Sequence, residues 1–194
     1  MNEQFPTLTD IAGLAIRLSP IQIGQFETYA RELIDWNKRI NLTSITEQSL
    51  IYKLHFLDSL TSCMAIPNLA KMHVSVCDVG SGAGFPGLPL KIAFPTIRLT
   101  LVDSISKRTD FLKQIVNILG LDEVTVVTDR SESILKSSLY SGISHQLSNL
   151  IPGELMKSSN VSFKSNLYTF KSIVTNEAGG SLNIPLYMLK GQGI

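Results

Sequence analysis

The sequence predicts an α/β protein in which a doubly wound, parallel sheet follows a helical N-terminal segment. Short apolar runs alternate with helical patterns through the middle of the chain, in the order strand, helix, strand, helix, strand. A glycine-rich turn separates the first of these strands from the helix after it. With 194 residues, 44% of them hydrophobic and 17% charged, the chain is long enough for one such domain and too apolar to be disordered.

The N-terminal segment, residues 1–66, is predicted to form a helical cap. Ser19, Pro20 and Gln22 are typical of a helix start, with a capping serine, a proline in the first turn and a glutamine three residues after the serine. Apolar residues recur behind them at a helical spacing, and a second, unusually apolar helical run is expected from Glu47 to about Leu60. We expect these helices to cover one side of a sheet.

The remaining residues, 67–194, are predicted to form the sheet domain. Strands are expected at 74–79, 98–103 and 124–128, with helices over 88–94 and, capped by Ser104, through about 119. Parallel pairing is expected because a helix follows each of the first two strands. From about residue 136 onward the pattern is poor, and only 183–191 suggests another strand, so we expect an atypical and incomplete C-terminal part.

Composition excludes several classes of protein. The net charge of +1 gives no overall attraction to nucleic acid, so any RNA affinity must come from a local basic face. Cys63 and Cys77 lack the spacing of a metal site and are expected to be buried apolar residues, with no metal bound. We expect no secretory signal, because the first residues include Glu3 and Asp10 and lack a long apolar core. No apolar run reaches the roughly 18 residues that span a bilayer. We therefore expect a cytoplasmic monomer that does not enter a membrane.

The glycine-rich turn is the candidate ligand site. Gly80, Gly82 and Gly84 follow the first strand of the sheet domain, and glycine lets a backbone approach a ligand closely. Asp78 lies directly before them, where its carboxylate would repel the pyrophosphate of a dinucleotide. S-adenosylmethionine instead carries an ammonium and a sulfonium, so Asp78 favours this cofactor. The alternative is that Asp78 caps a turn or a helix.

Two further positions fit an adenosine-type ligand. Asp103 ends the second strand, where a carboxylate can accept hydrogen bonds from both ribose hydroxyls. The same position serves nicotinamide cofactors, so Asp103 does not choose between the two ligands. Ser131 and Glu132 follow the third strand, where the adenine edge would lie in this fold.

Two pairs of cations are candidates for RNA contact. Lys38 and Arg39 lie beside Trp36 at the expected end of the first helix, where cations also complement the helix dipole. Their functional alternative is a phosphate-binding patch with a stacking aromatic ring. Lys107 and Arg108 fall in the first turn of a helix, the unfavourable end for a cation, which is a mild argument for phosphate contact. A solvated helix face without a binding role is the alternative, and it is the more common reason for such cations.

In order and spacing, these motifs resemble those of the 16S ribosomal RNA guanine-N7 methyltransferases, the family also called glucose-inhibited division protein B. The resemblance covers roughly residues 18–135 and rests on the segments 36–43, 55–60, 78–87, 101–108 and 130–132. It implies a Rossmann-like class I S-adenosylmethionine-dependent methyltransferase fold with an N-terminal helical cap. It also implies 16S ribosomal RNA, or the small ribosomal subunit, as the partner.

The resemblance also implies roles for single residues. Gly80 and Phe85 would line the cofactor pocket, Asp103 would hold the ribose, and Ser131 with Glu132 would border the adenine, although the family more usually has alanine before this glutamate. After the third strand the family has a segment of the form YDxVxxRAVA, whose arginine joins the site. Nothing between residues 135 and 187 matches it, so an altered or truncated C-terminal third is expected.

The implied activity is methyl transfer from S-adenosylmethionine to nitrogen-7 of a guanine in 16S ribosomal RNA. Nitrogen-7 carries an exposed lone pair and needs no general base, so the catalytic residue is left unassigned. His55 is accordingly expected to be a structural residue on a helix. Two alternatives stay open: a truncated relative with impaired or no activity, and a nicotinamide-dependent oxidoreductase.

Overall fold

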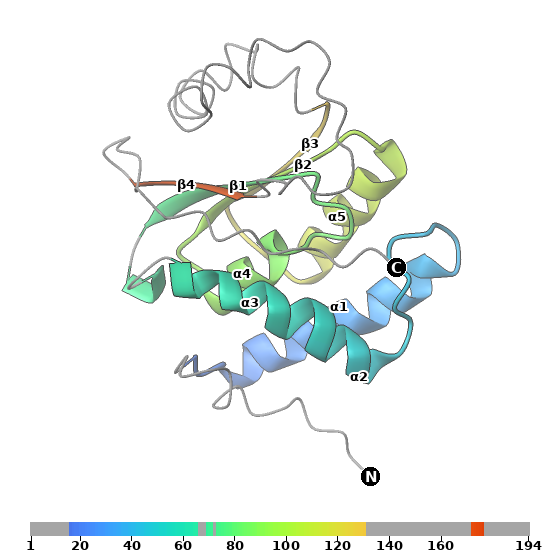
Figure 1. Cartoon of the computed structure of the whole chain (residues 1–194), viewed down its shortest axis with the longest axis horizontal. Coiled ribbons are helices and arrows are strands. Elements are labelled where there is room, and N and C mark those ends of the chain that lie inside the picture. The colour runs from blue at the N-terminus through green and yellow to red at the C-terminus, as the bar shows by residue number, and fades with distance from the viewer. Residues whose placement is uncertain (1–15, 66–68, 72, 131–171, 177–194) are drawn as a thin grey trace.

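The computed structural model describes residues 16–65, 69–71, 73–130 and 172–176 (Figure 1). The described residues up to 71 form helices and turns: α1 (Pro20–Asn37), α2 (Gln48–Ile51), a π-helical stretch (Tyr52–Leu57), α3 (Asp58–Thr61) and short 3-10 turns (Ser62–Ala65 and Leu69–Lys71). Strands and helices then alternate as β1 (Val74–Val79), α4 (Gly87–Ala93), β2 (Arg98–Asp103), α5 (Ser106–Ile118) and β3 (Val124–Thr128), with β4 at Ser172–Asn176.

The strands form one sheet in the order β3-β2-β1-β4. The pairs β1–β2 and β2–β3 are parallel, as predicted from the alternation of strands and helices. In this register Asp78 lies opposite Leu101, and Asp103 lies opposite Thr128. The carboxyl ends of β1 and β2, and the two aspartates near them, therefore meet at the same edge of the sheet.

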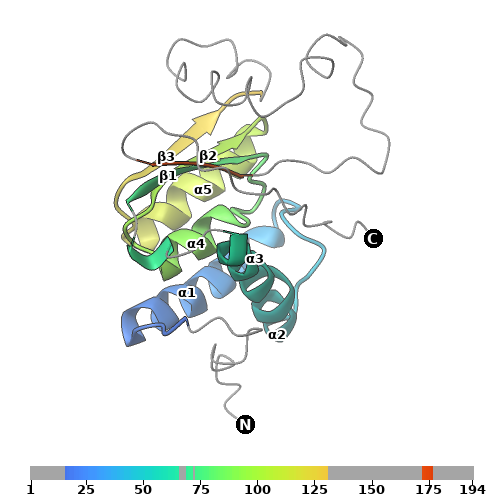
Figure 2. The same ribbon diagram turned by 60° about the vertical axis from the view of Figure 1, so that its left-hand side comes forward.

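The described helices lie on one face of this sheet (Figures 1 and 2). Helices α4 and α5 pack on the strands, while α1 packs on α4 and α5, and α3 packs on α4. The layers share one core, in which Tyr29, Phe56, Leu88 and Phe111 are completely buried. Because the N-terminal helices contribute their largest side chains to this core, they stabilise the same packing that holds the sheet domain.

The start of α1 confirms the predicted capping box. The Ser19 hydroxyl accepts a hydrogen bond from the Gln22 N–H (3.3 Å), and the Gln22 side chain accepts one from the Ser19 N–H (2.7 Å). The side-chain amide of Gln22 also donates to the carbonyls of Ile92 (2.7 Å) and Ala93 (3.1 Å). One glutamine thus caps α1 and ties it to the end of α4.

Two predictions about local structure were wrong. Ser104 does not cap α5, whose first residue is Ser106 and whose N-cap is Ile105. The reason is that the carboxylate of Asp103 accepts the Ile105 N–H at 2.9 Å, so the turn after β2 is closed by Asp103 and the helix begins beyond it. Strand β4 was also missed; it pairs antiparallel with β1, and the strand expected at 183–191 lies outside the described residues.

The two cysteines are buried free thiols, as predicted. Burial, with the charge of Asp78 adding, raises the pKa of Cys77 to about 12, which keeps this thiol protonated and unreactive at neutral pH. No described helix is long and apolar enough to cross a membrane. Within the same part of the chain, no three His, Cys, Asp or Glu side chains are grouped so that they could hold a metal ion.

Replacing Gln22 with alanine should lower the free energy of unfolding by about 2 kcal/mol, because a helix cap and the hydrogen bonds to α4 are lost together. Ile21→Ala is the control, since Ile21 is 76% exposed and its truncation should change the free energy by less than about 0.5 kcal/mol. Urea unfolding followed by circular dichroism measures both. Equal stability of the two variants would contradict the link between α1 and α4.

Candidate functional site

The outer side of the loop between β1 and α4 is open. Gly80, Gly82 and Gly84 have φ angles of 72°, 58° and 98°, which glycine adopts at little cost and other residues rarely adopt. A Cβ atom added to Gly80 would meet nothing within 4 Å, and one added to Gly82 would meet only the Gly80 carbonyl at 4.0 Å. Within the described part of the chain, the space beside these two glycines, where a Cβ atom would stand, is therefore free for a ligand.

The inner side of the loop is tightly packed. A Cβ atom on Gly84 would lie 2.5 Å from Leu88 Cδ1 and 2.7 Å from the Tyr29 hydroxyl. That hydroxyl donates a hydrogen bond to the carbonyl of Ala83 at 2.5 Å. The loop thus lies directly on side chains of α1 and α4, and these contacts fix its position relative to the core.

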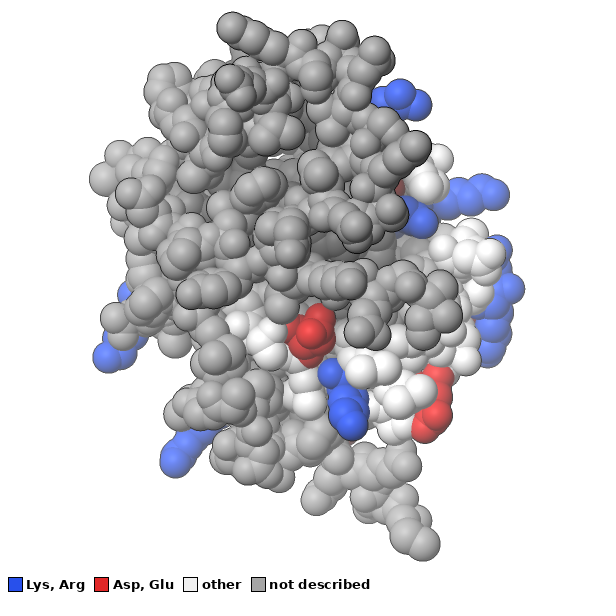
Figure 3. All heavy atoms as spheres, in the orientation of Figure 1, with Lys and Arg blue, Asp and Glu red and all other residues white. Residues whose placement is uncertain are grey.

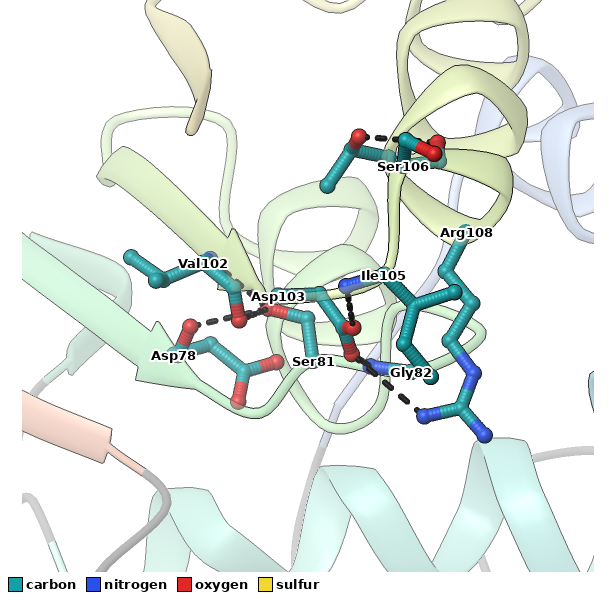
Figure 4. Close-up of polar contacts among 9 residues, drawn as sticks. Asp78, Ser81, Gly82, Val102, Asp103, Ile105, Ser106 and Arg108 are labelled. Carbon is teal, nitrogen blue, oxygen red and sulfur yellow. Dashed lines mark hydrogen bonds and ion pairs between the residues drawn. The ribbon is translucent and has the colours of Figure 1, made fainter. Parts of the chain in front are cut away.

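Ser81 connects the loop to both strands (Figure 4). Its hydroxyl, which is buried, donates to the Asp78 carbonyl (2.8 Å) and accepts from the Val102 N–H (3.0 Å). The Val102 carbonyl in turn accepts the N–H groups of Gly80 (2.8 Å) and Ser81 (2.9 Å). These bonds turn the loop back over the end of β2. Sequence reasoning did not single out Ser81, although a serine within the glycine motif was a usable signal.

Asp78 is completely buried at the end of β1. Its Oδ2 accepts the N–H of Gly87, the first residue of α4, at 3.1 Å. This is the helix-capping role that the sequence left open as an alternative. A contribution of its negative charge to cofactor binding stays a prediction.

Asp103 faces the loop from the end of β2, with its side chain 4% exposed (Figure 4). Its Oδ1 accepts the Ile105 N–H at 2.9 Å, and its Oδ2 accepts the Gly82 N–H at 2.9 Å. Arg108 forms an ion pair with the same Oδ2 at 3.7 Å. The structure thus brings together a predicted loop glycine, the predicted ribose carboxylate and one of the predicted RNA-binding cations.

Phe85, at the end of the loop, is enclosed by aromatic rings from the N-terminal helices. The His55 ring stacks on it with centroids 4.5 Å apart and planes 12° apart, and the Tyr29 ring lies 5.7 Å away at 27°. Nε2 of His55 is 2.7 Å from the Thr43 hydroxyl, within hydrogen-bonding distance. His55 lies in the π-helical stretch, on a helix as predicted, and holds Phe85 from the N-terminal side.

The first pair of candidate RNA-binding cations, Lys38 and Arg39, is exposed at the end of α1. Both pair with Asp35, at 3.4 and 3.1 Å, and the Arg39 guanidinium lies 4.6 Å from the centre of the Trp36 ring. The Trp36 ring packs on Phe111 with centroids 5.5 Å apart. The end of α1 therefore lies beside α5.

The second pair, Lys107 and Arg108, lies in the first turn of α5, as predicted, and Lys107 is exposed. In Figure 3, Lys and Arg side chains follow the right-hand edge of the molecule, where Figure 1 places α5 and the end of α1. Ser131 and Glu132, the candidates for the adenine edge, lie outside the described residues.

Comparisons with known proteins match the stretch that contains this loop. The family model described as "rRNA small subunit methyltransferase G" matches residues 22–146. The chain is 46% identical to a protein named ribosomal RNA small subunit methyltransferase G of Pediococcus pentosaceus over 125 residues, which are 64% of this chain and 51% of that protein. It is 47% identical to the protein of the same name from Limosilactobacillus reuteri over 131 residues, 67% of this chain and 54% of that protein. The chain thus spans about half the length of the curated relatives it matches.

Alanine substitutions at two loop glycines should separate backbone strain from packing. Gly84→Ala should lower the free energy of unfolding by about 3 kcal/mol, because the new Cβ overlaps both Leu88 and Tyr29 at a positive φ. Gly80→Ala, at a positive φ but with open space around it, should cost about 1 kcal/mol. Urea unfolding of both variants measures the difference. Equal losses would show that the inner side of the loop is not packed as described.

Proposed function

This chain belongs to the rRNA small subunit methyltransferase G family, and we propose that it transfers a methyl group from S-adenosylmethionine to nitrogen-7 of a guanine in 16S ribosomal RNA. The observation that supports this most is the glycine-rich loop lying against the carboxylate of Asp103, with Gly82 and Asp103 joined by a 2.9 Å hydrogen bond. Both residues fall within the matched stretch, 22–146.

The loop fits this cofactor because its outer side is open at Gly80 and Gly82 and is bordered by a carboxylate that can accept ribose hydroxyls. S-adenosylmethionine, when bound, supplies an electrophilic methyl group on its sulfonium. The proposed binding residues in and beside the loop are Asp78, Gly80, Gly82, Gly84, Phe85 and Asp103. Ser131 and Glu132, which follow β3 in the sequence, are proposed with them.

The loop fits a dinucleotide poorly. In a dinucleotide site, free N–H groups at the start of the helix bind the pyrophosphate. Here the N–H of Gly87, the first residue of α4, is bonded to Asp78, whose buried negative charge would repel a phosphate. The geometry therefore favours a cationic ligand over NAD.

The proposed reaction requires the protein to bind the cofactor and the RNA and to orient them, without a proton acceptor. Nitrogen-7 of guanine has a lone pair outside the aromatic ring system, so its attack on a methyl group requires no proton acceptor. Holding two reactants in line can lower the barrier by roughly 7–11 kcal/mol. The nearby side chains are consistent with a reaction that needs no proton acceptor. His55 lies within hydrogen-bonding distance of Thr43 and stacks on Phe85, and the high pKa of Cys77 leaves its thiol protonated.

We propose that the RNA contacts the protein along the edge formed by the end of α1 and the start of α5. Lys38, Arg39, Lys107 and Arg108 supply the positive charge there, and contact with the phosphate backbone would position the guanine without reading its sequence. A local patch of this kind is what a chain of net charge +1 requires. The proposed partner is the small ribosomal subunit or its RNA, which would place the activity in the cytoplasm.

Asp103→Ala is expected to weaken S-adenosylmethionine binding about 10- to 100-fold, because a charged acceptor for the ribose is lost. Asp110→Ala removes an exposed carboxylate from α5 and should leave the affinity unchanged. Isothermal titration calorimetry measures both, with NAD as a second ligand that should not bind. Wild-type binding of NAD in place of S-adenosylmethionine would refute the proposed cofactor.

Arg108 links the two proposed binding sites. The Asp103 carboxylate accepts two hydrogen bonds, from the N–H groups of Ile105 and Gly82, whereas Arg108 lies 3.7 Å away in an ion pair that is too long for a hydrogen bond. Two ribose hydroxyls would take the two remaining lone-pair positions, and these added donors would weaken the attraction of the carboxylate for Arg108. Arg108 has the longest contact, 3.7 Å, and the more exposed side chain, so its ion pair is the easiest to break. Cofactor binding would thus release this guanidinium for an RNA phosphate.

This coupling predicts that S-adenosylhomocysteine, which carries the same ribose, tightens RNA binding by the wild type about two- to fivefold. The effect should vanish in Arg108→Ala and persist in Lys107→Ala, which removes a neighbouring charge that does not pair with Asp103. Fluorescence anisotropy with a 16S RNA fragment measures the affinities. Undiminished tightening in Arg108→Ala would contradict the coupling.

A further inference from the structure

Tyr29 lies in the middle of α1 and is absent from the predicted site, yet its side chain reaches the glycine-rich loop. It is completely buried, and its hydroxyl donates to the Ala83 carbonyl, 54 residues away in the sequence, at 2.5 Å. Ala83 is itself 4% exposed, so water has little access to this carbonyl. Without the hydroxyl, a buried acceptor in the loop would lose its partner.

Three successive loop residues depend on this one side chain. The hydroxyl binds Ala83, it would lie 2.7 Å from a Cβ on Gly84, and the ring stacks beside Phe85 at 5.7 Å. Burial, with the charge of Asp78 adding, raises the pKa of Tyr29 well above its usual value. The hydroxyl therefore stays protonated and remains a hydrogen-bond donor across the whole working range of pH.

We propose that Tyr29 is a positioning residue for cofactor binding, which holds the glycine-rich loop in the conformation that accepts the ligand and makes the helical cap part of the cofactor site. This inference rests on the proposed function, since the loop must bind a cofactor for its position to matter.

The physical reason lies in the glycines. A loop with Gly80, Gly82 and Gly84 has more backbone freedom than other sequences and loses more entropy when a ligand fixes it. The Ser81 bonds hold the start of the loop on β2, whereas Tyr29 holds its end on α1. An anchor at each end reduces the conformations that binding must remove, so affinity is gained by preorganisation.

Tyr52 provides a matched control. It is also buried in the N-terminal segment, and its hydroxyl accepts a hydrogen bond from the Gln48 side chain at 2.6 Å. Its ring contacts Phe56 at 5.7 Å, as the Tyr29 ring contacts Phe56 at 5.0 Å. Tyr52→Phe thus removes one partly buried hydroxyl from the same aromatic cluster, but its bond to Gln48 lies within the helical segment.

The test compares Tyr29→Phe with Tyr52→Phe by two measurements on the full chain. Calorimetry should show a five- to tenfold loss of S-adenosylmethionine affinity for Tyr29→Phe and no change for Tyr52→Phe. Hydrogen exchange without ligand should be faster over residues 82–87 in Tyr29→Phe alone. Phenylalanine keeps the ring stacks, so both variants should fold.

The outcomes separate this inference from the proposed function. Wild-type affinity together with unchanged loop exchange in Tyr29→Phe would overturn the positioning role and leave the function standing. Equal losses in both variants would also overturn it, because they would reflect general destabilisation. Absence of S-adenosylmethionine binding by the wild type would refute the proposed function, and the positioning role with it.

Discussion

The site depends on the way in which the backbone after β1 is turned back over the end of β2. Ser81 makes this turn possible, because its buried hydroxyl bonds to the backbone of both strands. Once the loop is held there, the Gly82 N–H meets the carboxylate of Asp103, and the open side of the loop faces outward. On the opposite side, Tyr29 and Leu88 support the loop from the core. The site is therefore shared between the sheet and the N-terminal helices.

The features that could be predicted from the sequence are those set by local chemistry. The capping box of Ser19 and Gln22 needs only residues three positions apart, and it forms as expected. The three parallel strands follow from short apolar runs separated by helices, and their register brings Asp78 and Asp103 to one edge without further information. The motif also marked the turn after β1, although the positive φ angles of its glycines were not predicted.

The features that could not be predicted arise from contacts distant in sequence or from competition between neighbours. Tyr29 had the pattern of an ordinary core residue, and its bond to Ala83 appears only when α1 packs beneath the loop. Ser104 had a suitable side chain for a cap, but the carboxylate of Asp103 takes the Ile105 N–H first. Strand β4 pairs antiparallel with β1, and its run of β-branched residues, Ile173, Val174 and Thr175, was a signal that the sequence analysis did not use. The ion pair between Asp103 and Arg108 could not be predicted either, because Asp103 was expected to bind the ribose and Arg108 to contact RNA.

Methyl transfer itself is the most direct test of the central claim. The purified chain would be incubated with S-adenosylmethionine labelled in its methyl group and with small ribosomal subunits that lack N7-methylated guanine, and the RNA would then be digested to nucleosides. We expect label in 7-methylguanosine with the wild type. We expect none with Asp103→Ala when the cofactor concentration is below the dissociation constant of that variant. A chain that binds the cofactor and leaves both subunits and free 16S RNA unlabelled would contradict it.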